Sequence, residues 1–125
     1  MRIVVYLVLV FITTSVNAGW MNMEDTDNEV HYMDTDTIVS DGVLRKVWQL
    51  TDRKKAGSDG VMSLRVLLEF DCSAETYRLL EIFAYSKPMA TGVVVHSLLF
   101  GSQSEWSGVP ERTVTDRIAL ISCAI

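Results

Sequence analysis

Apolar and polar residues alternate along most of the chain after position 18, which is the period of β-strands and not of helices. The alternation predicts strands over residues 19–23, 30–34, 43–51, 63–72, 76–86 and 93–100. Polar or glycine-containing segments separate them, and Asp41-Gly42 is a strong hairpin signal. We expect 24–29 to be an acidic loop, 35–40 a connection that buries Ile38, and 101–110 a long loop. The pattern therefore predicts an antiparallel sheet of about six strands.

Two of the predicted strands indicate which side chains face the core. Successive side chains of a strand point to opposite faces, so apolar residues two positions apart share a face. The strand over 63–72 sets Val66, Leu68, Phe70 and Cys72 on one face against Arg65, Glu69 and Asp71 on the other. The strand over 43–51 sets Leu44, Trp48 and Leu50 on one face. We expect the apolar set of each strand to face the core.

The hydrophobic period changes near the end of the chain. Over 111–121, Val114, Ile118 and Ile121 recur at helical spacing, and Pro110 stands just before the start. The chain is therefore predicted to be α+β, with a run of antiparallel strands followed by one C-terminal helix packed on a face of the sheet.

The two cysteines, Cys72 and Cys123, lie 51 positions apart and far from any Cys-x-x-Cys spacing. In an oxidising compartment such a pair most simply forms one structural disulfide. The bridge would tie the end of the helix to the sheet. On an ideal helical wheel, however, Cys123 lies nearly opposite Val114, Ile118 and Ile121. Either the helix ends near Ser122 and the tail turns back, which we favour, or the helix is apolar on most sides and deeply packed.

The first 18 residues have the form of a signal peptide. Arg2 precedes an uncharged apolar run over 3–12, and Val16-Asn17-Ala18 offers the small residues that signal peptidase accepts. The run is shorter than the roughly 20 residues of a membrane-spanning helix, and no cysteine near the site could carry a lipid. We therefore expect a signal peptide over 1–18 and one exported domain over 19–125, periplasmic or secreted and not a lipoprotein. Loss of Arg2 makes the net charge of −5 one unit more negative, which argues against nucleic-acid binding.

No residue pattern indicates an enzyme, a cofactor or a metal site. His31 and His96 lie within predicted strands, and no Gly-x-Ser-x-Gly motif is present. Asp25, Asp27, Glu29 and Asp36 resemble a calcium loop, but Val30 occupies the position of its required glycine. A copper site would need soft donors, which are available in Met21, Met23, His31 and Met33. Methionine more often fills gaps in a core, so we expect neither a metal site nor a cofactor.

One basic cluster stands out in this acidic chain. Arg53, Lys54 and Lys55 lie in a polar, glycine-rich segment that should be a hairpin loop. Such a cluster is either a solvated loop tip or a contact for an acidic protein partner, and the second would weaken as salt rises.

An ordered set of residues also resembles the bacterial surface-adhesin protein E family. The set comprises Trp20, Tyr32-Met33-Asp34, Val47-Trp48-Gln49-Leu50, Glu69-Phe70-Asp71-Cys72, Tyr77-Arg78, Tyr85-Ser86, Met89-x-x-Gly92, Trp106, Val109-Pro110 and Cys123. The resemblance implies a six-stranded antiparallel sheet with a C-terminal helix held on one face by the disulfide. It also implies binding of host matrix or serum proteins such as laminin, vitronectin and plasminogen.

Two functions follow as expectations. The first is a non-enzymatic exported domain that acts by protein–protein contact at the cell envelope. The second is a periplasmic module that binds a small ligand or a metal between sheet and helix. Exposed strand edges can also pair with each other, so a homodimer is a further expectation.

Overall fold

The computed structural model describes residues 2–4, 6, 8–10 and 19–125. The predicted cleavage motif at 16–18 lies outside these residues. The described residues before position 11 are exposed and form no helix or strand, and no helix in the described part of the chain has the length and apolarity to cross a membrane. The elements in chain order are β1 (Trp20–Asp25), β2 (Glu29–Asp34), β3 (Val39–Asp41), β4 (Leu44–Arg53), β5 (Ser63–Asp71), β6 (Thr76–Lys87), β7 (Thr91–Leu99), the 3₁₀ turn η1 (Gly101–Gln103), β8 (Ser107–Gly108) and α1 (Val114–Cys123).

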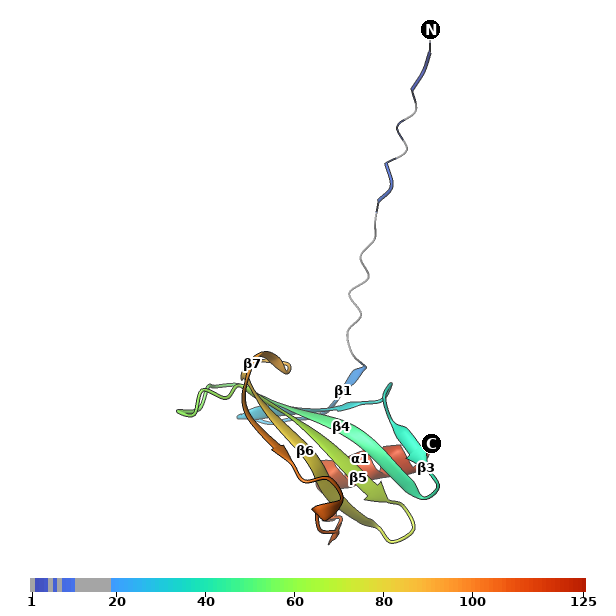
Figure 1. The fold of residues 1–125 in the computed structure, drawn as a ribbon, viewed down its shortest axis with the longest axis vertical. Coiled ribbons are helices and arrows are strands. Elements are labelled where there is room, and N and C mark those ends of the chain that lie inside the picture. Colours follow the sequence, from blue (N-terminus) through green and yellow to red (C-terminus); the bar gives the residue numbers. More distant parts are fainter. Residues whose placement is uncertain (1, 5, 7, 11–18) are drawn as a thin grey trace.

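The six longer strands form one antiparallel sheet in the order β1-β2-β4-β5-β6-β7 (Figure 1). This confirms the predicted α+β class and the six main strands. Two short strands are added to them, since β3 pairs with β4 and β8 pairs with β6. Both lie in segments that were predicted as connections. Three and two residues are too short for an alternation of apolar and polar positions to appear in the sequence.

The acidic segment over 24–29 is shorter as a loop than predicted. Glu24 and Asp25 belong to β1, and Glu29 belongs to β2. The pairing of β1 with β2 shifts register between Asn22 and Glu24, which adds a residue to β1. Thr26 then closes the turn, because its backbone N–H and its hydroxyl both donate to the carbonyl oxygen of Glu29.

The main core lies between α1 and one face of the sheet (Figure 1). Its fully buried members come from four elements: Met33, Val47, Leu68, Phe70 and Ile118. Val66, Ile38, Val114 and Ile121 pack against them, as predicted. The pairing register explains this set, since Leu68 lies opposite Val47 and both therefore point to the same face.

The expected core face of β4 is confirmed only in part. Leu50 is fully buried and shares a face with Trp48, but Leu50 pairs with Arg65 and Trp48 with Leu67, so this face points away from α1. Val47, which the prediction left out, points toward α1 and is also fully buried. The prediction missed Val47 because β4 is covered on both faces, and alternation identifies the core only where one face is in water.

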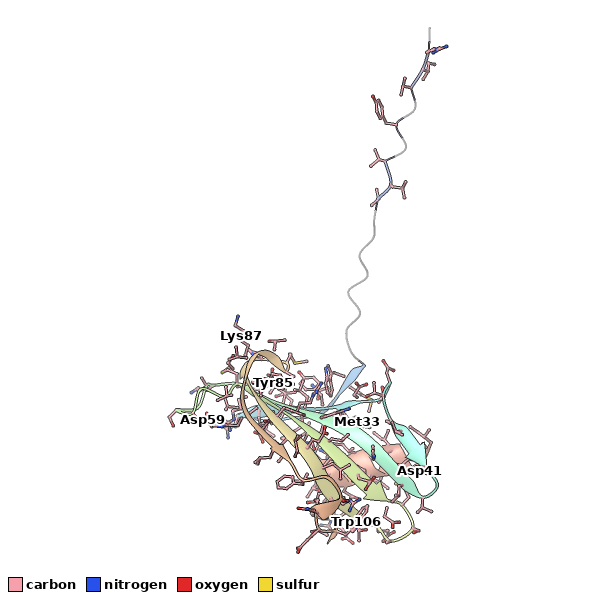
Figure 2. The ribbon with its side chains drawn as sticks, in the orientation of Figure 1. Met33, Asp41, Asp59, Tyr85, Lys87 and Trp106 are labelled. Carbon is pink, nitrogen blue, oxygen red and sulfur yellow. A yellow bond between two sulfur atoms is a disulfide. The ribbon has the colours of Figure 1, made fainter. Side chains whose placement is uncertain are left out.

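The face opposite α1, here called the second face, is covered from both ends. At one end the hairpin between β6 and β7 folds over it: the Ser63 hydroxyl donates to the Lys87 carbonyl and accepts from the Ala90 N–H. At the other end Trp106 stacks on Arg78, with the guanidinium carbon 4.4 Å from the ring centroid. Figure 2 shows Lys87 and Trp106 at these opposite ends.

The middle of the second face carries Arg65 between two aromatic rings. Its guanidinium carbon lies 4.2 Å from the Trp48 ring centroid and 5.5 Å from that of Phe83. Glu69 was expected on a polar face, but it is buried because it forms an ion pair with Arg78, from Nη2 to Oε1 at 2.7 Å. Stacking and ion pairing thus let charged side chains occupy a largely covered face.

The disulfide is present, with a sulfur–sulfur distance of 2.05 Å between Cys72 and Cys123. The helix ends close to the favoured position, since Cys123 is the last residue of α1 and Ala124 caps it. Cys123 is itself helical, however, and does not lie in a tail that turns back. The alternative of a helix packed on most sides does not hold, since Leu120 is 65% exposed. Cys72 follows the last residue of β5, at the end of a strand and beside the helix. A sulfur on the flank of α1 can therefore reach it.

Candidate functional site

The terminal strand β7 leaves one edge of the sheet free. Among the described strands it pairs only with β6, and most of its apolar side chains are exposed: Val93, Val94, Leu98, Leu99 and the adjacent Phe100. The Phe100 N–H donates to the Leu80 carbonyl, so the alternating geometry of antiparallel strands turns the N–H and C=O groups of Ser97 and Leu99 outward. An outer edge of this kind is a template for another extended chain.

The two edges of the sheet differ in charge. Residues 88–104 contain no aspartate, glutamate, lysine or arginine, so β7 carries none of the charges that usually block pairing. The opposite edge strand, β1, ends in Glu24 and Asp25. Irregular register does not distinguish the two edges, since it occurs once between β1 and β2 and twice between β6 and β7. Among the described strands β7 is therefore the edge suited to contact with another protein.

The three residues of the predicted basic cluster line one small concavity with Asp27, Asn28 and Glu29, but they differ in their ion pairs. Arg53 forms an ion pair with Asp59 at 3.1 Å, and Lys54 forms one with Asp25 at 2.6 Å. All four side chains are partly exposed to solvent. Lys55 is exposed, and no ion pair joins it to another residue in the described ranges. The Met89 N–H donates to Asp52 Oδ1 at 2.9 Å, so this loop lies at the same end of the sheet as the start of β7.

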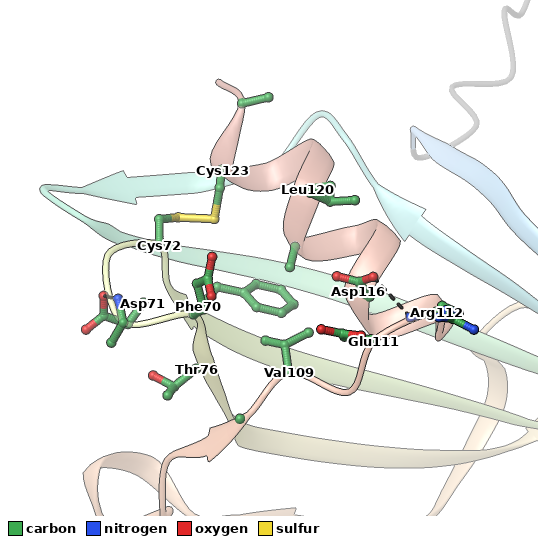
Figure 3. A pocket seen from close by; sticks show the side chains of 15 residues that line it. Phe70, Asp71, Cys72, Thr76, Val109, Glu111, Arg112, Asp116, Leu120 and Cys123 are labelled. Atoms are coloured by element: carbon green, nitrogen blue, oxygen red, sulfur yellow. Dashed lines mark hydrogen bonds between the residues drawn. A yellow bond between two sulfur atoms is a disulfide. The ribbon is translucent and has the colours of Figure 1, made fainter.

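A groove of about 790 Å³ opens between α1 and the turn that joins β5 to β6 (Figure 3). One wall is the turn between β5 and β6, and the other is the C-terminal half of α1, joined to the turn by the disulfide. The segment over 108–112 closes the base. Four carboxylates line the groove against one guanidinium: Asp71, Glu75, Glu111 and Asp116, with Arg112. It is thus a strongly acidic concavity.

The pKa of Asp71, on the rim of this groove, is held below its usual value. The Ser73 hydroxyl contributes most and the Ala74 N–H next, each by donating to Oδ1. Hydrogen bonds to the carboxylate favour its charged form. The stabilisation that Asp71 contributes is therefore fully present above its pKa in the unfolded chain, and it is lost as pH falls through its lower pKa in the folded chain. Asp71 is therefore ionised at neutral pH.

Replacing Ser73 by alanine should raise the pKa of Asp71 toward its ordinary value. The variant keeps the Ala74 N–H as a donor, so the shift should be partial. An NMR titration of the Asp71 side-chain carboxyl carbon measures it directly, with Asp59 as internal control, since the Val61 N–H and then Arg53 lower the pKa of Asp59 independently of Ser73. An unchanged titration of Asp71 would show that the hydroxyl does not carry the shift.

The residues considered for metal binding or catalysis are engaged elsewhere or far apart. Met33 is buried in the main core, and both ring nitrogens of His31 have protein partners: Glu29 Oε1 at 3.0 Å and Thr51 Oγ1 at 3.1 Å. His96 lies on β7, with β4, β5 and β6 between it and His31. No three His, Cys, Asp or Glu side chains in the described ranges are arranged to hold a metal ion.

Sequence patterns missed both surfaces described above. The run over 93–100 was recognised as a strand, but an edge strand and a buried strand of this composition look alike. The groove joins two stretches that are distant in the sequence, 70–76 and 108–124, so only the fold brings their carboxylates together. The one available signal for β7 was the lack of charge over 88–104.

Comparison with solved structures finds the same fold in Haemophilus influenzae protein E. A selenomethionine form aligns with a TM-score of 0.68 and 16% identity, covering 89% of this chain and 90% of that one. Crystal form II aligns with a TM-score of 0.66 and 16% identity, covering 89% and 91%. A search of curated proteins finds no match.

A family model described as surface-adhesin protein E matches residues 20–124, which is almost the whole of the folded domain. The match includes every strand, the helix and both cysteines of the disulfide. The chain therefore belongs to the surface-adhesin protein E family.

Proposed function

We propose that this chain is an exported, non-enzymatic binding domain that contacts a host matrix or serum protein through the β7 edge. The exposed, uncharged edge of β7 carries the proposal, and membership of an adhesin family supports it. Export would follow cleavage after Ala18, which N-terminal mass analysis of the secreted form would reveal as a chain beginning at Gly19. Release into the periplasm or the medium without a lipid anchor belongs to the same proposal.

Strand addition is the binding mode that suits β7. The outward N–H and C=O groups of Ser97 and Leu99 would pair with an extended segment of the partner, and the exposed side chains would pack against its apolar residues. Val93 and Leu99, 69% and 70% exposed, offer the largest apolar contacts of the strand. Lys55 lies at the same end of the sheet as the start of β7 and would meet an acidic residue of the partner.

Placing lysines on this strand should weaken binding strongly. The double variant Val93→Lys/Leu99→Lys would bring unpaired charges against the incoming strand, and we expect a loss of affinity of at least about tenfold. Biolayer interferometry against immobilised laminin, vitronectin and plasminogen measures the loss. Val39→Lys/Val43→Lys is a matched control, since it adds the same charge at exposed apolar positions of another hairpin. Equal affinities for the two variants would contradict the assignment of β7.

The basic loop is a secondary contact in this proposal. Replacing Arg53, Lys54 and Lys55 by serine should weaken binding modestly and reduce its salt dependence. Because Arg53 and Lys54 are already paired, Lys55→Ser alone should reproduce most of the effect.

A second copy of the chain is the competing occupant of β7. Two β7 strands can pair antiparallel about a two-fold axis, because the edge carries no charges that repel each other. Sedimentation velocity distinguishes the cases. A dimer that Val93→Lys/Leu99→Lys dissociates would assign the edge to self-association, whereas a monomer leaves it free for a partner.

The groove favours the periplasmic small-ligand module as a second candidate function. Its volume falls in the usual range of ligand sites. Cell fractionation separates the two candidates: protease accessibility on intact cells or release into the medium favours adhesion, and retention in the periplasm favours the module.

A further inference from the structure

The groove beside the disulfide is a preformed concavity with apolar walls. The Cys72–Cys123 bridge joins its two sides, β8 pairs with the start of β6, and the Val109 N–H donates to the Glu75 carbonyl at 3.2 Å. Each of these links ties the segment over 108–112 or the helix to the turn between β5 and β6. A site held in this way loses little conformational freedom when it is occupied.

Apolar groups in the groove lack an explanation in the fold itself. Leu120 lines it and is 65% exposed, although α1 buries Ile118 and Ser122 against the sheet. Val109, Ala119 and the disulfide continue the apolar surface (Figure 3). An aliphatic side chain of a ligand could pack against this strip and remove it from water.

The charged side chains around the apolar strip determine which charge on a ligand the groove favours. The Asp71 carboxylate accepts hydrogen bonds from Ser73 and Ala74, and the Asp116 carboxylate accepts one from the Arg112 N–H. Glu75 and Glu111 are different, because neither side chain forms a hydrogen bond or an ion pair with the rest of residues 19–125. Glu75 belongs to the turn between β5 and β6, and Glu111 to the segment over 108–112 at the base. Two uncommitted carboxylates beside an apolar strip complement cations and repel anions.

We propose that this groove binds a lysine- or arginine-containing segment of another protein, with an aliphatic side chain against Leu120 and cationic groups at Glu75 and Glu111. This contact is separate from β7 and does not depend on strand addition. Binding should weaken as salt rises, because the carboxylates are partly exposed.

A fluorescein-labelled peptide of alternating lysine and leucine, titrated by fluorescence anisotropy into the chain purified after export, tests the proposal. Glu75→Gln/Glu111→Gln should weaken binding about fivefold or more, in line with two partly exposed charge pairs. Asp27→Asn/Glu105→Gln removes two exposed carboxylates outside the groove and should leave the affinity unchanged. Equal losses in both double variants would overturn the groove as the site and leave only general attraction to an acidic protein.

Two further arms separate this inference from the proposed function. Leu120→Asn should weaken the lysine–leucine peptide but not a lysine–serine peptide, and an equal effect on both would contradict the apolar contact. Val93→Lys/Leu99→Lys should leave the groove's affinity unchanged. A loss there, with none in Glu75→Gln/Glu111→Gln, would move the peptide to the strand edge and overturn the proposal.

Discussion

Replacing Cys72 and Cys123 together by alanine is expected to lower the free energy of unfolding by about 4 kcal/mol. The two residues are separated by 51 positions, so the bridge closes a long loop and restricts the unfolded chain strongly. A domain of this size has a net stability of only about 5–15 kcal/mol. The bridge should therefore account for a large share of the total.

Urea unfolding followed by far-ultraviolet circular dichroism measures this change. Wild-type protein unfolded in the presence of a reductant should show the same loss, since it too lacks the bridge. A loss below about 1 kcal/mol in both samples would contradict the account, because α1 would then be held by packing around Ile118 alone.

Breaking the buried ion pair between Glu69 and Arg78 is the second large effect expected. The side chains are only 5% and 17% exposed, and Nε and Nη2 of Arg78 both donate to Oε1 of Glu69, at 2.9 and 2.7 Å. Arg78→Met keeps the aliphatic stem beneath Trp106 but leaves Glu69 without its counter-charge. We expect it to cost about 3 kcal/mol or more of stability.

The double variant Glu69→Leu/Arg78→Met separates this cause from lost packing. With both charges removed, the site becomes apolar and most of the stability should return. If the double variant is as unstable as Arg78→Met, the stack with Trp106 and not the ion pair holds this end of the second face.

Alternation predicts this fold well where one side of a strand is in water and poorly where both sides are covered. Leu68 and Phe70 were assigned to the core correctly because Arg65 and Asp71 mark the other face of β5. In β4, Val47 and Leu50 are both fully buried on opposite faces, so alternation identifies only one of the two buried sets. Glu69 shows the same limit. Its partner Arg78 comes from β6, and Trp106, which stacks on Arg78, comes from the segment after β7.

The candidate binding surfaces were harder to predict from the sequence than the strands, because they depend on how the strands and the helix are arranged. The pairing of the two cysteines was predictable from their number alone. The side of α1 that carries Cys123 was not, because a helical wheel does not show that the strand end with Cys72 lies beside the helix. The free edge of β7 depends on the strand order, in which β7 is last. The paired state of Arg53 and Lys54 depends on Asp59 and Asp25, which come from two different hairpins.

The central claim is that a partner protein adds a strand along β7. Amide hydrogen exchange, measured by NMR on the exported chain with and without the tightest-binding protein of the matrix and serum panel, tests it most directly. The account predicts that the outward N–H groups of Ser97 and Leu99 exchange at least about tenfold more slowly in the complex, as hydrogen bonds to the partner form. Unchanged exchange at both amides in the saturated complex would contradict it.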